Sequence, residues 1–150
     1  MKISNKWIYP VVIAIVAAGC GSLRPYEDRI VSSWKLTTVK KYGLRRGGTA
    51  SFTQGQFTFY PAGKLEYTDS AGHIYKGTWN MKDTRQVTGF RNYRSSTVNN
   101  SLYVNVINFD NQDMKSEIFD DILFTGKDKF RAYVYGERDY TYYFEKQEGE

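Results

Sequence analysis

The chain contains very few of the side chains on which enzymes and metal proteins most often rely. Its 150 residues include one Cys, Cys20, and one His, His73. A single Cys excludes a disulfide within the chain, and one Cys with one His cannot provide the ligand set of a zinc site. Asp69 and Ser70 precede His73 in a turn-forming stretch, where such residues normally shape the backbone rather than form a catalytic triad. We therefore predict a protein that is not an enzyme and that has no catalytic residues, no metal and no cofactor.

The chain also lacks an apolar run long enough to span a membrane. Its most apolar stretch covers residues 7–18, whereas a transmembrane helix needs about 20 apolar residues. The stretch follows Lys2 and Lys6 and leads into Gly19 and Cys20. A charged start, an apolar middle and a small-residue exit are typical of a secretion signal. We expect residues 1–19 to be removed after export.

The end of this signal, Ala17-Ala18-Gly19-Cys20, resembles the lipobox of Gram-negative lipoproteins. The resemblance implies that Cys20 carries a diacylglycerol and that its new amino group carries a further acyl chain such as palmitate. Two acyl chains already anchor a protein stably, because each buried CH₂ contributes about 0.8 kcal/mol. Gly21 and Ser22 follow without the Asp that retains lipoproteins in the inner membrane. We expect the outer membrane, at its periplasmic face rather than the cell surface, with residues 20–29 as lipidated Cys and tether.

The part that remains after cleavage is rich in aromatic residues and only slightly basic. Without residues 1–19 it has 131 residues, of which 23 are aromatic, 19 basic and 16 acidic, a net charge of +3. This length is enough for one domain with its own core and too short for two. Basic residues gather between Lys40 and Arg46, where a solvated loop is the simpler interpretation. We expect no nucleic-acid partner.

From residue 30 onward the pattern is typical of antiparallel β-structure. Short runs of β-branched and aromatic residues are separated by Gly, Asp and Asn, and apolar residues alternate along runs such as 101–109. Residues 80–100 are polar, and the sequence leaves open whether they form a strand or a long loop. About eight sequential strands favour an up-and-down meander, and closure into a barrel would remove its exposed edges. The expected strands cover residues 30–39, 51–60, 64–68, 73–79, 101–109, 117–125, 129–135 and 140–146.

Three local patterns follow one another in this part of the chain. They are Ile30-Val31-Ser32-Ser33-Trp34-Lys35-Leu36, then Phe57-Thr58-Phe59 before a Pro/Gly turn, then Tyr75-Lys76-Gly77-Thr78-Trp79. Their order and spacing look like the bacterial lipocalin-like domain family, over about residues 29–146. The resemblance implies an eight-stranded lipocalin-like barrel over residues 30–146, followed by a polar tail, residues 147–150.

The resemblance also implies which residues form the base of the barrel. In lipocalins a Trp in the first strand closes one end of the barrel, and a late Arg stacks on it. Trp34 matches this Trp, and Lys146 is the nearest basic residue to the Arg position. Ser32 stands where lipocalins have Gly.

Two functions are compatible with such a barrel, and they come from different classes of protein. In the first, the interior holds one small hydrophobic ligand against inward-facing aromatic residues. In the second, side chains fill the barrel, and exposed tyrosines and the Lys40–Arg46 loop dock on another envelope protein. We favour the first, a lipid-anchored, non-catalytic, lipocalin-like binding module of the outer membrane. Its candidate ligand-binding residues are Phe59, Tyr67, Tyr75, Tyr142 and Phe144.

Overall fold

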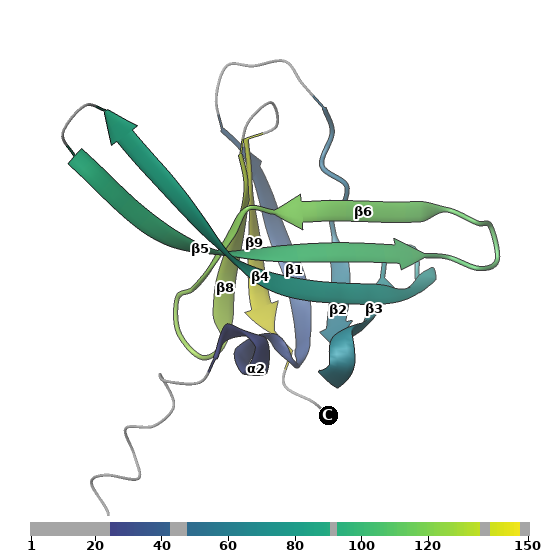
Figure 1. The fold of residues 1–150 in the computed structure, drawn as a ribbon. Coiled ribbons are helices and arrows are strands. Elements are labelled where there is room, and N and C mark those ends of the chain that lie inside the picture. Colours follow the sequence, from purple (N-terminus) through teal and green to yellow (C-terminus); the bar gives the residue numbers. More distant parts are fainter. Residues whose placement is uncertain (1–24, 43–47, 91–92, 136–138, 148–150) are drawn as a thin grey trace, which may run out of the picture.

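A single antiparallel sheet makes up most of the structure, and it curls into a nearly closed barrel (Figure 1). Each strand lies beside the strand that precedes or follows it in the chain, except where the first strand pairs with the last. This topology confirms the prediction of an all-β, up-and-down antiparallel barrel, although it has nine strands rather than about eight. The strands are β1 (Ser33–Lys41), β2 (Gly55–Phe59), β3 (Lys64–Thr68), β4 (Ile74–Phe90), β5 (Tyr93–Ile107), β6 (Met114–Phe119), β7 (Asp121–Phe124), β8 (Lys129–Val134) and β9 (Tyr140–Lys146).

The structure is a computed structural model that describes four stretches of the chain. These stretches are residues 25–42, 48–90, 93–135 and 139–147, and for residues 84–90 and 93–98 only the backbone is described. The predicted signal, Cys20 and residues 148–150 lie outside the described residues. In Figure 1, β4 and β5 cross in front of β1, β8 and β9.

A short helix precedes the first strand, where the sequence predicted a tether and then a strand from residue 30. This helix, α2 (Tyr26–Ile30), follows Pro25, whose fixed φ suits a helix start. Glu27 lies in its first turn and Arg29 in its last, so both charges complement the helix dipole. Ile30 ends the helix and is buried, and the strand therefore begins later, at Ser33.

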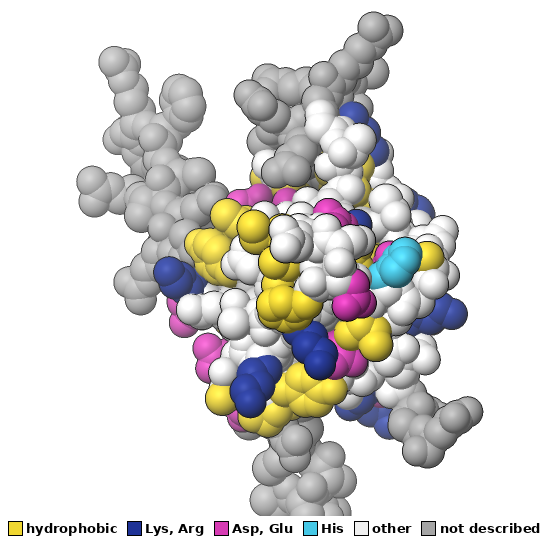
Figure 2. Space-filling view, turned by 90° about the vertical axis from the view of Figure 1, so that its right-hand side faces the viewer, with side chains coloured by type: hydrophobic (Ala, Val, Ile, Leu, Met, Phe, Trp, Pro, Cys, Tyr) yellow, Lys and Arg dark blue, Asp and Glu magenta, His cyan; other side chains and the backbone are white. Residues whose placement is uncertain are grey.

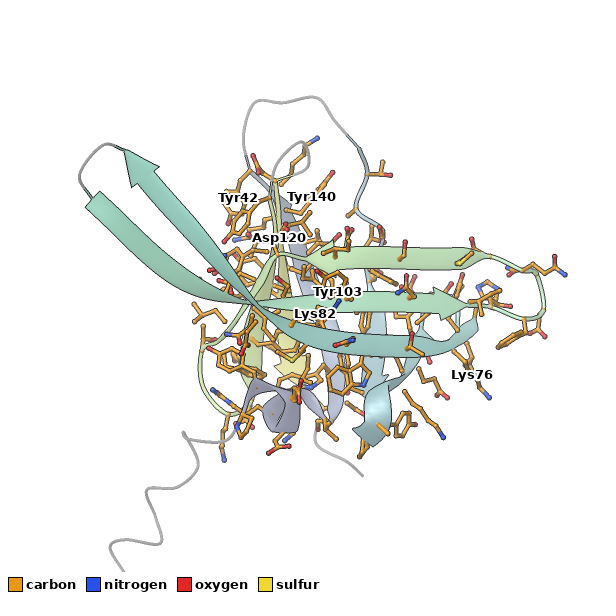
Figure 3. The ribbon with its side chains drawn as sticks, in the orientation of Figure 1. Tyr42, Lys76, Lys82, Tyr103, Asp120 and Tyr140 are labelled. Atoms are coloured by element: carbon orange, nitrogen blue, oxygen red, sulfur yellow. The ribbon has the colours of Figure 1, made fainter. Side chains whose placement is uncertain are left out.

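The extra strand arises because the chain bends at Asp120, inside the range 117–125 that was predicted as one strand. The backbone N–H of Asp120 donates to Tyr133 O (2.7 Å), and its side chain accepts the backbone N–H of Tyr135 (2.7 Å). Ser101 Oγ on β5 donates to Asp120 O (3.0 Å). Figure 3 shows Asp120 where β6 ends. The bend divides one run into β6, which pairs with β5, and β7, which pairs with β8.

The edge strands β6 and β7 close the barrel without a ladder between them. The sheet order begins with β6 and ends with β7, so the described strands include no β6–β7 pairing. The link is made instead through β5, where the backbone N–H of Asn100 donates to Asp121 Oδ1 (3.2 Å). We call this junction, held by Asn100, Ser101, Asp120 and Asp121, the seam.

Residues 80–100, which the sequence left open between strand and loop, form the outer part of a long hairpin. Strands β4 and β5 pair without interruption from Lys76 opposite Ile107 to Phe90 opposite Tyr93. The outer half of this hairpin projects from the barrel (Figure 1). A projecting two-stranded ribbon has no core on either side, so neither of its faces needs to be apolar. The alternation of apolar and polar residues that marks a barrel strand is therefore not required there.

One end of the barrel is closed by α2 and an aromatic cluster around Trp34. The Trp34 side chain is fully buried, and its indole N–H donates to Ile30 O (2.7 Å). Its ring meets Phe130 and Phe124 edge-on, with centroids 4.8 and 6.0 Å apart. Lys146 Nζ lies 6.0 Å from the Trp34 ring, at the outer limit of a cation–π contact. The structure thus places both residues that the resemblance assigned to the base at this end.

Candidate functional site

The five aromatic residues predicted to line a ligand site are all buried inside the barrel. Each of them contacts at least one other aromatic ring. Tyr67 and Tyr75 lie together, with ring centroids 5.4 Å apart. Phe144 stacks on Phe130 at 4.3 Å, Phe59 meets Trp79 at 5.8 Å, and Tyr142 meets Phe119 at 5.0 Å.

A buried carboxylate inside the barrel is the feature that sequence reasoning missed. Glu117 on β6 is 4% exposed and shares the inner face of its strand with Phe119. Tyr142 Oη donates to Glu117 Oε2 (3.1 Å), and the backbone N–H of Ser51 lies 3.4 Å from the same oxygen. A buried carboxylate is tolerated only when it is hydrogen-bonded, because burial removes its hydration. Glu117 and Tyr142 therefore form a polar site within the aromatic interior.

The bend at Asp120 explains why the sequence did not reveal Glu117 as an interior residue. In an unbroken strand, side chains alternate, so Glu117 and Ile122 would face opposite sides. Ile122 would share its face with the apolar Ile118 and Phe124, so that face would be expected inside and Glu117 outside. In the structure both are buried, because the break changes the alternation between β6 and β7. Glu117 could have been recognised as an interior residue from Phe119, because the two residues are two positions apart and therefore share one face of the strand.

The stretch before β2 covers the barrel interior without joining the sheet. We call residues 48–54 the plug segment. Phe52 is 1% exposed, and its ring meets Phe57 and Tyr67 edge-on at 5.0 and 4.9 Å. The sequence predicted a strand from residue 51, whereas β2 begins at Gly55. Gly55 has φ +126°, and a Cβ there would lie 2.4 Å from Thr68 O, so β2 begins at a position that only glycine fits.

Side chains of the barrel hold the plug segment in place. Tyr140 Oη donates to Gly48 O (3.0 Å), Tyr67 Oη donates to Gln54 O, and Glu117 faces the backbone N–H of Ser51. Among backbone–backbone hydrogen bonds between described residues, none involves residues 48–54. The plug segment is therefore attached through side chains and the burial of Phe52.

Two buried tyrosines line the side of the interior next to the plug segment. Burial is the main cause that raises the pKa of Tyr67 to about 12, and the charge of Asp69 adds to it. Burial also raises the pKa of Tyr75 to about 12, together with the hydrogen bond from Tyr75 Oη to Asp113 Oδ2 (2.8 Å). Lys115 Nζ lies 5.4 Å from the Tyr75 ring. Both phenols are hydrogen-bond donors held in their neutral form.

Alkaline titration should reveal these two phenols. An unfolded tyrosine loses its proton near pH 10, whereas folded Tyr67 and Tyr75 keep theirs to about pH 12. Between these values the unfolded state binds fewer protons, so stability falls as pH rises. We expect a late fraction in the phenolate absorbance at 295 nm, reduced in Tyr67→Phe, and a lower unfolding free energy at pH 11 than at pH 9. Titration of all tyrosines in one step near pH 10 would contradict this expectation.

A second group of tyrosines lies on the outer face of β8 and β9. A hollow of about 340 Å³ is lined by five tyrosines with Arg131 and Asp139 among their neighbours. Tyr42 and Tyr140 lie at the same end of the barrel in Figure 3. Tyr42 is 50% exposed and Tyr135 52% exposed. We call four of these tyrosines the outer tyrosine face: Tyr42, Tyr133, Tyr135 and Tyr143. Tyr140 lies at its edge, where its hydroxyl group reaches the plug segment.

Hydrogen bonds and cations organise the outer tyrosine face. Tyr42 Oη and Tyr143 Oη are 3.0 Å apart, and this hydrogen bond is the main cause that raises the pKa of Tyr42. Lys40 Nζ and the Arg131 guanidinium lie 5.3 and 5.2 Å from the Tyr143 ring. The predicted Lys40–Arg46 loop starts at this end of β1, but residues 43–47 lie outside the described residues. Tyrosines and cations together form a surface suited to contacts with polar partners.

A larger hollow lies outside the other end of the barrel. It has a volume of about 710 Å³ and lies between α2, η3 (Pro61–Gly63) and β4, where Trp79 and Met81 contribute apolar surface and Glu27 and Asp28 contribute charge. Figure 2 shows the side of the molecule with the β3–β4 and β5–β6 connections, where apolar side chains are interspersed with charged ones.

The only His in the chain lies beside an Asp side chain. Asp69 and His73 form an exposed pair at the β3–β4 turn, with His73 Nδ1 2.9 Å from Asp69 Oδ2. The His73 contact is the main cause that lowers the pKa of Asp69. In the described ranges, no group of three His, Cys, Asp or Glu side chains is placed to hold a metal ion.

None of the helices in the described part of the chain is both long and apolar enough to cross a membrane.

The fold and the site define an up-and-down antiparallel barrel with one aromatic, helix-covered end and a plug segment over its interior. Comparison with protein-family models, curated proteins and solved structures finds no match to this chain. The lipocalin-like family therefore stays a prediction from the sequence patterns.

Proposed function

We propose that this chain is a lipid-anchored, non-catalytic, lipocalin-like module of the bacterial outer membrane that binds a small, largely hydrophobic ligand inside its barrel. The observation that supports this proposal is the inward-facing pair of Glu117 and Tyr142, placed among aromatic rings beneath the plug segment. Ligand sites combine apolar walls with a few polar groups that orient the ligand. The barrel interior has this composition.

A purely structural role explains Glu117 less well than a binding role does. Replacing a buried ionic group by packed hydrophobic residues is often neutral or stabilising, so such a group is weak evidence for stability. Glu117 lies on the same inner strand face as Phe119, where an apolar residue would fit the surrounding core. A carboxylate at this position supports recognition of a polar group on a bound molecule.

A second function is favoured by the outer tyrosine face. Its hollow of about 340 Å³ combines exposed tyrosines with Arg131, and Tyr and Arg are enriched where proteins bind one another. Interior rings in mutual contact also agree with a filled barrel. In this alternative the module docks on another envelope protein through the outer tyrosine face, without a small ligand.

The two functions differ in what the protein carries when it is isolated. Native mass spectrometry of the full mature protein, extracted from its own host's envelope in mild detergent, should detect a small molecule that is lost on denaturation. A bare protein mass, unchanged after incubation with a panel of lipids and aromatic compounds, would favour the docking function instead.

The predicted anchor has its own test. Cys20→Ala removes the acylated thiol, so we expect loss of radioactive palmitate incorporation and loss of the protein from the outer-membrane fraction. Ser22→Ala is the matched control and should keep both properties. Unchanged palmitate labelling of Cys20→Ala would show that Cys20 is not the lipidation site.

A further inference from the structure

We propose that Phe52 and the backbone N–H of Ser51 occupy the ligand site themselves, and that a small aromatic amine displaces them when it binds. This inference names the ligand class for the proposed function and rests on it. The plug segment contributes an aromatic ring and a hydrogen-bond donor to adjacent parts of the interior. An aromatic amine contributes the same two groups in one small molecule.

The ring position is defined by two neighbours. Phe52 meets Phe57 and Tyr67 edge-on, with interplanar angles of 72° and 75°. Edge-to-face arrangements of this kind are the favoured geometry of aromatic pairs. A ligand ring that replaces the Phe52 ring would find the same two partners. The site is therefore shaped for one six-membered aromatic ring.

The donor position is defined by Glu117. The Ser51 N–H lies 3.4 Å from Glu117 Oε2, which is longer than the usual 2.9–3.0 Å of an N–H···O bond. An ammonium group forms shorter and stronger bonds to a carboxylate than a neutral amide does. A protonated amine is therefore a better partner for Glu117 than the chain's own amide.

The plug segment can leave without breaking the sheet. The described residues include no backbone–backbone hydrogen bond to residues 48–54, so opening costs side-chain contacts and the burial of Phe52. Such weakly attached elements open at lower free energy than core strands. Gly55, the first residue of β2, directly follows the segment and has φ +126°, so a glycine joins the plug segment to the sheet. The end of the barrel away from the plug segment is closed by α2 and Trp34 (Figure 1).

The first experiment measures binding of 2-phenylethylamine to the full mature protein by calorimetry, with 2-phenylethanol as the uncharged analogue. Phe52→Ala should bind the amine at least tenfold more tightly than the wild type, because the competing ring is gone. Glu117→Gln in the Phe52→Ala background should weaken amine binding at least tenfold and leave 2-phenylethanol binding within twofold. Thr53→Ala, an exposed position in the same segment, is the matched control and should behave as the wild type.

Amide hydrogen exchange of the wild type keeps the inference testable if Phe52→Ala does not fold. Saturating 2-phenylethylamine should speed exchange of the Ser51 amide at least fivefold, because the ligand takes its place at Glu117, and should leave β2 unchanged. Amine binding that leaves this exchange unchanged, or that is equally tight with Glu117→Gln, would overturn the inference. So would a native adduct of another chemical class that binds with the plug segment in place, although that adduct would preserve the proposed function. Absence of any adduct and of any binding would overturn both.

Discussion

Trp34→Ala is expected to destabilise the barrel by about 3–5 kcal/mol, the range measured when a buried Trp or Phe is truncated. Trp34 is fully buried at the end of the barrel that α2 covers, and its ring contacts Phe124 and Phe130. The substitution removes these contacts and leaves Ile30 O without its indole donor. The loss can be measured as the change in unfolding free energy in urea, followed by circular dichroism.

Two further variants separate the causes of this loss. Trp34→Phe keeps an aromatic ring but removes the hydrogen bond to Ile30 O, so it should cost less than Trp34→Ala. Lys146→Ala removes a cation that is exposed and 6.0 Å from the Trp34 ring, and should change stability by no more than about 0.5 kcal/mol. A loss below about 1 kcal/mol for Trp34→Ala would mean that this end of the barrel is not an integral part of the core.

The second large effect is expected for Gly77→Ala in the middle of β4. A Cβ at Gly77 would lie 1.9 Å from Asn105 O and 2.8 Å from Val106 Cα, both backbone atoms of β5. Backbone in a ladder cannot move aside as a flexible side chain can, so β4 and β5 would have to separate locally. We expect a loss of about 3 kcal/mol or more, at the upper end of the costs of overpacking.

Thr78→Ala is the matched control for Gly77→Ala, because Thr78 is the next residue of β4 and is exposed. We expect it to change stability by about 0.5 kcal/mol or less. Guanidinium unfolding of the two variants compares them directly. If Gly77→Ala unfolds at the same denaturant concentration as Thr78→Ala, the backbones of β4 and β5 do not approach closely enough at Gly77 to exclude a Cβ.

The sequence predicted the fold class because most barrel strands are short and half buried. Alternation along 101–109 sets Leu102, Val104 and Val106 on one face of the strand, and the structure shows that this face is the buried one. The alternation of apolar residues did not identify strands that have no core beside them, and it did not show where a strand is interrupted. The projecting half of the β4–β5 hairpin has no core to face, and the bend at Asp120 divides β6 from β7.

The candidate site could be predicted only in part. Phe59, Tyr67, Tyr75, Tyr142 and Phe144 were expected to face inward, and all five are buried. The sequence did not indicate the contact between the plug segment and Glu117, because it joins distant parts of the chain. Ser51 and Glu117 are 66 positions apart in the chain, and their approach follows from the path of the plug segment rather than from any local pattern. The run that contains Phe52 looks like a strand, but the strand begins only at Gly55.

The seam gives this barrel a mechanical property that fully hydrogen-bonded barrels lack. In a closed barrel, the number of strands and their stagger determine the diameter. Here the described edges, β6 and β7, are joined through bonds such as Ser101 Oγ to Asp120 O rather than by a continuous ladder. Separation of β6 from β7 along the seam would therefore break side-chain hydrogen bonds but no ladder between the nine described strands.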